Sequence, residues 1–317
     1  MQILSERDDR PHEPDDDPLW QESSLFVWHD RASGLGGFWR LGQEPVVQAV
    51  NSCFGLFTHD GLRFRSNVTG VPMAPVDRGE AHMGWGPHLK VVFDGDARIT
   101  ADFPDCEASL RFTDFHPRFD YHTIAMPGQR LEGAAHHFEV SGRMTGRVRI
   151  GDRELEIDAL GYRDRSWSRR DWSRIRGTRW WPCVFGPDLT THIIHLVHEG
   201  RLLKVGYVWR GGRTIAIIDS DVVVQLESDA LTPRAGEAVL YLETGEELRV
   251  RCDRTDGIVM HVRGYTAVET IGTAYLDGME GMSNLEVCTN AACGSQPPWF
   301  AMGSNITDGL SHRSNGE

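Results

Sequence analysis

The chain contains very little lysine. Only Lys90 and Lys204 occur among its 33 basic residues, whereas acidic residues number 46 and the formal net charge is -13. Proteins bind nucleic acid through clustered Lys and Arg that displace counterions, so this acidic balance predicts no nucleic-acid partner. Schiff-base catalysis needs a lysine amine and therefore has just two candidate residues.

Long apolar runs and paired cysteines are also lacking. No uninterrupted apolar stretch approaches the ~18 residues of a membrane span, and residues 1–20 are charged where a signal peptide would be apolar. We therefore expect a cytoplasmic protein with no membrane span. The six cysteines form no CxxC pair, which favours free, buried thiols over disulfides or zinc ligands.

Familiar catalytic and cofactor motifs are missing as well. There is no GxSxG, HExxH or P-loop pattern. The glycines at 34–37 are followed by Phe38-Trp39-Arg40, which does not begin a helix as a dinucleotide loop requires. His192, His195 and His198 are spaced three apart, but strand alternation would send His195 to the opposite face from the other two. The sequence thus predicts neither a metal nor a cofactor.

The chain is instead rich in short β-branched and aromatic runs separated by Gly, Asp and Pro, a pattern typical of antiparallel strands. It predicts an all-β fold of barrels or curved sandwiches, which protect strand edges and can enclose an apolar ligand. Residues 247–252 alternate between polar and apolar types, indicating one solvated and one buried face. The expected strands are 88–93, 143–150, 154–160, 191–198, 202–209, 214–218, 222–226, 238–242, 247–252 and a final run, 258–270, that leads to Ile271-Gly272.

The length is sufficient for two domains. A seam is expected near Gly151–Asp158, which gives an N-terminal domain of residues 21–155 and a C-terminal domain of residues 156–317. Residues 1–20 are rich in Asp and Pro and are expected to form a flexible acidic arm.

Arginine and tryptophan are concentrated in the centre of the chain. Seven arginines lie between Arg163 and Arg179, and four tryptophans lie among or just after them. One interpretation is a structural clasp, because arginines stack on indoles and pair with carboxylates. The other is an apolar cavity walled by indoles, in which a desolvated carboxyl group stays protonated and acts as a general acid. Burial would raise the pKa of such a carboxyl and arginines would lower it, and the sequence leaves both outcomes open.

This central segment also carries a family resemblance. Gly161-Tyr-Arg-Asp-Arg-Ser-Trp-Ser-Arg-Arg-Asp-Trp172 resembles the G-x-R-D-H-S-W-G-x-R-D-W signature of carotenoid 1,2-hydratase-like proteins, a group that includes AttH-like proteins. Trp20-Gln-Glu-Ser23 and the segment 36–42 resemble the start of the N-terminal half in the same group. The resemblance implies two lipocalin-like (calycin-like) antiparallel β-barrel or curved-sandwich domains.

The resemblance further implies catalytic roles. Tyr162 and Asp164 match a catalytic Tyr-x-Asp pair whose Asp donates a proton to a carbon-carbon double bond, and His136 or His137 lies near the offset of a participating His. Two positions depart from the signature: Arg165 replaces a His and Ser168 replaces a Gly. A cation next to the acid would favour the ionised form of Asp164.

We therefore expect a cofactor-independent acid–base enzyme, a hydratase or dehydratase, isomerase or cyclase. Its substrate would be a hydrophobic unsaturated small molecule of isoprenoid or aromatic type, bound at the interface of the two β domains. Asp164 would protonate the substrate, and Tyr162 and His137 would orient it or relay the proton. The expected substrate-binding residues are Trp167, Trp172, Trp181, Arg165, His136 and Met282.

Two other functions remain open at this stage. The protein could be a non-catalytic lipocalin-like carrier, which needs the apolar pocket but no acid. Alternatively, the arginine-rich segment could be an anion site for a carboxylated substrate or a partner protein. A homodimer is also left open. Glu269 and Glu286 lie in expected strands and would need partners if buried, which the central arginines could supply.

Overall fold

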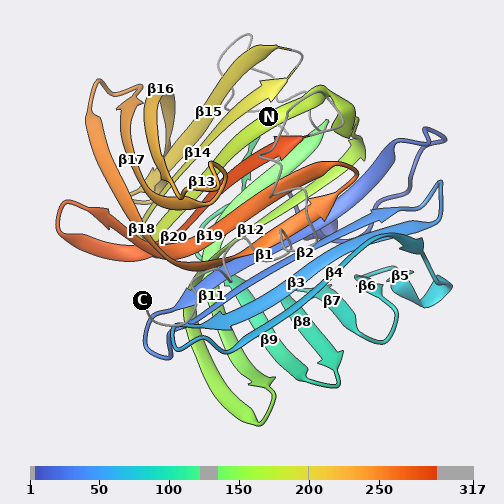
Figure 1. Ribbon diagram of the computed structural model, residues 1–317. Coiled ribbons are helices and arrows are strands. Elements are labelled where there is room, and N and C mark those ends of the chain that lie inside the picture. The colour runs from blue at the N-terminus through green and yellow to red at the C-terminus, as the bar shows by residue number, and fades with distance from the viewer. Residues whose placement is uncertain (1–3, 122–134, 199, 291–317) are drawn as a thin grey trace. The chain divides into compact units, whose positions relative to one another are not determined.

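The computed structural model describes residues 4–121, 135–198 and 200–290. The described residues up to Arg170 form one compact unit and those from Asp171 onward form a second. Nearly all regular structure in both units is antiparallel β-strand (Figure 1), which confirms the predicted all-β fold. None of the helices in the described ranges has the length and hydrophobicity needed to cross a membrane.

The first unit is one open, curved sheet of 12 strands whose spatial order is β4-β3-β2-β1-β12-β11-β9-β8-β7-β6-β5, with β10 paired to β11. Its first strand, β1, and its last, β12, are neighbours near the middle of the sheet. The elements are η1 (Glu6–Asp9), β1 (Trp20–Asp30), β2 (Leu35–Glu44), β3 (Ala49–Thr58), β4 (Arg63–Pro72), η2 (Pro75–Asp77), β5 (Arg78–Gly79), β6 (His82–Trp85), β7 (Leu89–Asp94), β8 (Asp96–Phe103), β9 (Cys106–Asp114), β10 (Phe119–Asp120), β11 (His136–Ile150) and β12 (Arg153–Arg169).

The second unit is a closed barrel in which each strand from β13 to β20 pairs with the next and β20 returns to β13. Trp181, Val208, Leu240 and Leu285 belong to the apolar cluster that fills it. The elements are η3 (Trp172–Arg174), β13 (Ile175–Gly186), β14 (Leu189–His198), β15 (Arg201–Arg210), β16 (Arg213–Leu226), β17 (Pro233–Leu242), β18 (Glu247–Val262), β19 (Tyr265–Leu276) and β20 (Met279–Asn290).

The domain boundary differs from the sequence-based expectation. Residues 151–158 belong to the hairpin of β11 and β12, whose register runs without a break from Ile150↔Arg153 to His136↔Trp167. A boundary at 155/156 would cut through this hairpin, and the two units divide after Arg170 instead. A Gly-Asp turn is a hairpin signal as readily as a domain seam.

The predicted flexible arm also makes specific contacts. Ser5 caps the short helix η1, which ends at Asp9. Asp9 is buried and forms ion pairs with Arg118 and Arg163. The acidic residues of this segment thus include a buried partner for the central arginines.

One strand assignment needs correction. The run 258–270 is not continuous, because β18 ends at Val262 and β19 begins at Tyr265. Arg263 and Gly264 between them have φ values of 47° and 86°, which is the conformation of a tight hairpin turn. Gly272 is no turn residue but lies within β19, where a Cβ atom would come 2.0 Å from the carbonyl oxygen of Asp253. That position needs glycine because of close backbone approach.

Other local predictions are confirmed. In β18 the residues from Glu247 to Asp253 alternate between exposed and buried. The described cysteines are all buried, and none of them forms a disulfide: they are Cys53, Cys106, Cys183, Cys252 and Cys288. Cys293 lies outside the described residues.

Candidate functional site

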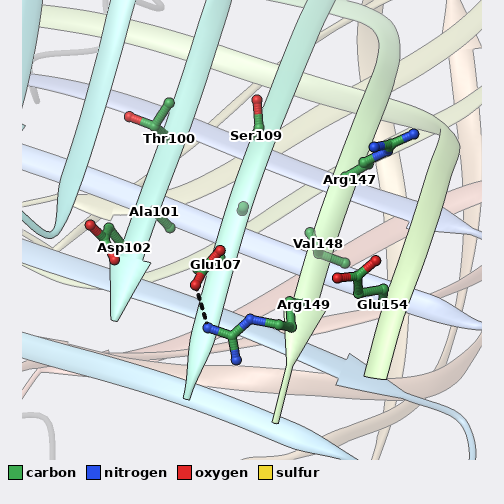
Figure 2. A pocket seen from close by; sticks show the side chains of 10 residues that line it. Thr100, Ala101, Asp102, Glu107, Ser109, Arg147, Val148, Arg149 and Glu154 are labelled. Carbon is green, nitrogen blue, oxygen red and sulfur yellow. Dashed lines mark hydrogen bonds and ion pairs between the residues drawn. The ribbon is translucent and has the colours of Figure 1, made fainter. Parts of the chain in front are cut away.

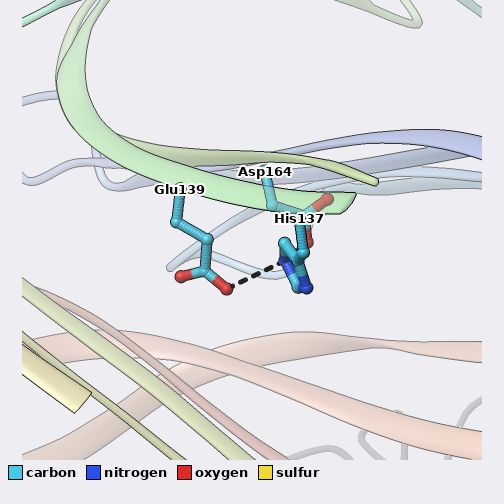
Figure 3. Close-up of side chains that lie close together, drawn as sticks. All are labelled: His137, Glu139 and Asp164. Atoms are coloured by element: carbon cyan, nitrogen blue, oxygen red, sulfur yellow. Dashed lines mark ion pairs between the residues drawn. The ribbon is translucent and has the colours of Figure 1, made fainter. Parts of the chain in front are cut away.

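Three titratable side chains meet on one face of the first unit's sheet, where β11 and β12 pair. Glu139 lies directly opposite Asp164 in the register, and His137 precedes Glu139 by two residues on the same strand. Side chains two residues apart on a strand share a face, and Figure 3 shows all three side chains in one group. The Nε2 atom of His137 is 3.2 Å from Oε1 of Glu139 and 3.8 Å from Oδ2 of Asp164.

This cluster is mostly shielded from water but still reachable. The side chain of Glu139 is fully buried, whereas those of His137 and Asp164 keep 14% and 13% of their surface exposed. Tyr162 precedes Asp164 by two residues on the same strand and is buried. The ring of Tyr121 lies 4.9 Å from the ring of His137. A carboxyl group with aromatic neighbours and a slightly exposed side chain can contact a small apolar molecule.

The environment of Asp164 raises the pKa of its carboxyl group. Burial is the largest influence and raises the pKa of this carboxyl, His137 lowers it, and the like charge of Glu139 raises it further. Arg170 and Arg40 lower it by smaller amounts, and the net shift is upward. The effect of burial on the pKa of Asp164 therefore outweighs that of the cations.

The arginines next to Asp164 in sequence lie on the other face of β12. The guanidinium carbon of Arg163 lies over the rings of Phe112 and Phe138, and that of Arg165 lies over Phe93. Arg163 forms ion pairs with Asp9 and Asp114. The clasp interpretation thus describes this face of the strand, whereas Asp164 with its raised pKa lies on the opposite face.

Arg165 forms a buried ion-pair cluster centred on Glu22. Its Nη2 atom lies 2.5 Å from Oε1 of Glu22, and Arg78 and His12 contact the same carboxylate at 2.6 and 2.8 Å. Burial alone would raise the pKa of Glu22, but Arg165, His12 and Arg78 together lower it from 4.5 to about 2. Arg165 was expected to favour the ionised form of Asp164, but its side chain lies on the opposite face of β12, where it pairs with Glu22.

The predicted substrate-binding residues are spread over several places. The ring of Trp167 is stacked between His12 at 3.9 Å and His136 at 5.0 Å. His136 pairs with Trp167 in the register, so strand alternation places both on the face opposite His137 and Asp164. The structure therefore brings His137, Tyr162 and Asp164 together but not His136, Trp167 or Arg165.

The remaining predicted residues belong to the second unit. Trp172 lies in η3 beside the ring of Tyr265, with 4.9 Å between ring centroids. Trp181 is part of the barrel's inner cluster and donates its indole N–H to Oγ of Ser283. Met282 is buried on β20. Their assignment to substrate binding stays a prediction.

Glu139 is the functional candidate that sequence reasoning missed. Its signal was nonetheless present in the Gly151-Asp152 pair, which lies between the expected strands 143–150 and 154–160. A two-residue turn pairs Ile150 with Arg153, and counting outward from that pair places Glu139 opposite Asp164. Register arithmetic of this kind works wherever a hairpin carries no bulge.

The same three side chains are also the type of donor set that holds a divalent cation. Their nearest ligand atoms all lie within 4.8 Å of one another, and this is the metal-ligand group found among the described residues. The His192, His195 and His198 series forms no such group among the described residues, and Nε2 of His195 lies 2.7 Å from Oγ of Ser220. The cluster of His137, Glu139 and Asp164 can therefore either bind a cation or exchange protons, and an experiment must distinguish these two functions.

A surface pocket of about 550 Å³ lies elsewhere on the first unit's sheet (Figure 2). Charged side chains on its walls include Glu107, Arg147, Arg149 and Glu154, and Arg149 pairs with Glu107. The pocket lies farther along β11, about 30 Å from Glu139 at ~3.3 Å per residue. Its charged walls do not suit an apolar substrate.

Comparison with solved structures shows that the fold is shared. An AttH-like protein of Nitrosomonas europaea superposes with a TM-score of 0.66 at 12% sequence identity, covering 91% of this chain and 97% of that one. CghA matches with a TM-score of 0.62 at 11% identity, covering 88% and 90%. Kievitone hydratase from Nectria haematococca matches with a TM-score of 0.60 at 7% identity, covering 91% and 93%.

Sequence comparison adds a family but no characterised relative. A family model described as a domain of unknown function (DUF7064) matches residues 5–291. No curated protein matches the sequence. The specific assignment to the carotenoid hydratases is thus not confirmed, whereas the likeness to an AttH-like structure is.

Proposed function

We propose that this protein, which belongs to the DUF7064 family, is an acid–base enzyme that hydrates, dehydrates, isomerises or cyclises an unsaturated apolar small molecule. The observation that carries the proposal is Asp164, a shielded carboxyl whose pKa is raised chiefly by burial and which lies 3.8 Å from His137. A raised carboxyl pKa beside a second titratable group is typical of a general acid. The name of one structural neighbour, a hydratase, supports this class, and CghA has been crystallised with the small molecule Sch210972.

In the hydration direction, the neutral Asp164 donates its proton to one carbon of a double bond, and positive charge develops on the other carbon. Water adds to that carbon through its oxygen. His137 accepts a proton from this water and passes it to the carboxylate of Asp164, which restores the starting state. In isomerisation the cation instead loses a different proton to the same pair, and no water is added.

The other members of the cluster assist this step. Oε1 of Glu139 lies 3.2 Å from Nε2 of His137, and this ion pair favours a ring position next to Asp164. Its negative charge also disfavours ionisation of Asp164. Tyr162 adds a buried phenol on the same face. The low exposure of the group limits competing proton loss to bulk water.

The test uses deuterium oxide, because proton donation to carbon then marks the substrate even when no net reaction occurs. The purified protein is incubated with geraniol, β-ionone or isoeugenol, and deuterium uptake is followed by mass spectrometry. We expect uptake into at least one of them, and a loss of ~10²-fold or more in Asp164→Asn, the usual contribution of a general acid.

A matched control lies on the same strand. Asp158→Asn makes the same chemical change at a carboxylate that is 61% exposed and paired with Arg143, and it should keep the wild-type rate. An Asp164→Asn variant that folds normally and exchanges at the wild-type rate contradicts the proposal. So does an activity that EDTA abolishes and Mg²⁺ or Mn²⁺ restores, because the cluster would then be a metal site.

The carrier hypothesis is tested by the same preparation. Native mass spectrometry should show a bound lipophile at high occupancy for a carrier, whereas an enzyme releases its product. The inside of the β13–β20 barrel is filled by the cluster around Trp181 and Leu285, so a lipocalin-type ligand inside that barrel would have to displace packed side chains.

A further inference from the structure

The side chains of His137, Glu139 and Asp164 have the mutual spacing of ligands around one metal ion (Figure 3). Their nearest ligand atoms all lie within 4.8 Å of one another. Two ligands of a tetrahedral Zn²⁺ ion lie about 3.4 Å apart when each is about 2.1 Å from the metal. The distances from Nε2 of His137 to the two carboxylates, 3.2 Å and 3.8 Å, lie on either side of that value.

The ring of His137 has bonding capacity that the described residues do not use. Its Nε2 atom is buried and takes part in no hydrogen bond with them, although Oε1 of Glu139 lies only 3.2 Å away. The contact therefore has the distance of an ion pair but not the geometry of a hydrogen bond. A neutral imidazole nitrogen carries a lone pair that binds a metal ion, so a cation between the three side chains would satisfy this atom.

The backbone holds the three ligands in place before any ion binds. Glu139 lies directly opposite Asp164 in a register that runs without a break along the β11–β12 hairpin. His137 lies two residues before Glu139 on the same face of β11. A site built on paired strands is more precise than one built on loops, so metal binding requires only rotations of side chains.

The carboxylate of Asp164 is available to a cation. In the part of the chain that the structure describes, its ion-pair contact is with His137 and not with an arginine or lysine. Glu22 also contacts a histidine, but it is paired with Arg165 and Arg78 as well. Two guanidinium groups already neutralise Glu22, so the structure favours a cation at Asp164 and not at Glu22.

The donor set indicates which ion fits. Mg²⁺ and Ca²⁺ prefer ligand shells made of oxygen, whereas an imidazole nitrogen favours transition metals and Zn²⁺. Zn²⁺ imposes no geometry of its own and is bound by His nitrogen together with Asp or Glu oxygen. The side chains of His137 and Asp164 keep 14% and 13% of their surface exposed, which gives the ion access.

We propose that His137, Glu139 and Asp164 form an inhibitory Zn²⁺ site. The two carboxylates neutralise the charge of the ion, and His137 supplies the nitrogen ligand. A carboxylate oxygen that is bound to Zn²⁺ carries no proton to give to carbon, so the bound ion switches the acid off. The inhibition rests on the proposed function, whereas the binding of Zn²⁺ does not.

Binding is measured by calorimetry on full-length protein that has been stripped with EDTA and then desalted. ZnCl₂ and MgCl₂ are the probes, and a Cys293→Ser background removes the cysteine that lies outside the described residues. We expect one Zn²⁺ per chain, bound at least ~10²-fold more tightly than Mg²⁺. No binding of Zn²⁺, or equal binding of the two ions, overturns the proposal.

Variants locate the bound ion. His137→Gln, Glu139→Gln and Asp164→Asn should each weaken Zn²⁺ binding by ~10²-fold or more, because loss of an outer partner of a ligand already costs about 10–100-fold. His59→Gln and Asp158→Asn make the same changes at exposed positions and should leave the affinity unchanged. If the three cluster variants bind Zn²⁺ as tightly as the wild type, the site lies elsewhere and the proposal is wrong.

A spectrum of the unaltered chain decides the question even if a variant does not fold. In ¹⁵N NMR of histidine-labelled protein, Zn²⁺ should shift the ring-nitrogen signal that is missing from His137→Gln or, if that variant does not fold, from Asp164→Asn spectra recorded with Zn²⁺. Co²⁺ in place of Zn²⁺ should give the visible absorption of a four- or five-coordinate ion with nitrogen and oxygen ligands. Absence of both signals contradicts the site.

The inhibition is measured by deuterium exchange into the test substrates. With free Zn²⁺ at ten times its Kd, about nine-tenths of the sites are occupied, and exchange should fall about tenfold and recover when EDTA removes the ion. Exchange that is unchanged or faster with Zn²⁺ bound overturns the inhibitory role. Failure of the proposed function is distinguishable, because metal-free protein would then exchange no deuterium, while calorimetry would still decide whether the Zn²⁺ site exists.

Discussion

Replacing Glu22 by Gln measures the strength of the ion-pair cluster that anchors the centre of the first unit's sheet. Glu22 is fully buried and contacts Arg165, Arg78 and His12, and its pKa falls from 4.5 to about 2. A folded-state pKa below the unfolded value stabilises the native state above the unfolded pKa, and this stability is lost as pH falls through the folded pKa. At 1.36 kcal/mol per pKa unit, the shift corresponds to about 3 kcal/mol at neutral pH.

Urea unfolding followed by tryptophan fluorescence provides the assay. The difference in unfolding free energy between wild type and Glu22→Gln should be about 3 kcal/mol at pH near 7 and should shrink toward zero between about pH 4.5 and about pH 2. Glu156→Gln, which removes an exposed partner of Arg147, should change stability by less than ~1 kcal/mol at any pH. A Glu22→Gln effect that is equally large at both ends of the range would refute the reasoning, because it would then arise from packing and not from charge.

Three further predictions address single residues. Glu139→Gln removes a like charge and should lower the pKa of Asp164, measured by NMR on ¹³C-carboxyl-labelled protein; an unchanged titration contradicts the proposed pairing. His195, whose pKa is lowered to about 4 mainly by burial, should remain neutral in an NMR titration until the pH falls below about 5, and a midpoint near 6.5 would be inconsistent with its environment. Gly272→Ala places a Cβ atom 2.0 Å from the carbonyl oxygen of Asp253 and should destabilise the barrel by at least ~2 kcal/mol in thermal unfolding. An unchanged stability would contradict this, because it would show that β18 and β19 can move apart at no cost.

The sequence predicted the elements better than their long-range partners. Hairpins follow from local turn chemistry, so Gly151-Asp152 correctly marks the bend between β11 and β12. The partner of Arg165 is 143 residues away in Glu22, and no local pattern specifies such a pairing. The local sequence likewise does not specify the pKa of Asp164, because that pKa depends on burial and on the face of β12 that each arginine occupies.

The departures from the family signature illustrate the same limit. Ser168, where the signature has Gly, has a φ of 121°, a region in which glycine is favoured. The motif's glycine thus reflects a backbone requirement that this chain meets with a serine, whose Oγ accepts a hydrogen bond from the backbone N–H of Ala135 at 2.7 Å. Arg165 also departs from the signature, which has His at this position. Its side chain forms the ion pair with Glu22 on the face of β12 opposite Asp164.

The pairing of β1 with β12 has a consequence for the order in which the protein can be made. The strands β1 and β12 lie side by side in the sheet (Figure 1). During synthesis β1 leaves the ribosome long before the end of β12, where Arg169 pairs with Trp20. Until then one edge of β1 is open, and Asp9 and Glu22 lack the arginines of β12 that neutralise them. Contacts this distant along the chain slow folding, and an open edge invites pairing with other chains. We therefore expect nascent chains that end before β12 to depend on chaperones. Once the whole of β12 has left the ribosome, we expect the first unit to fold without them.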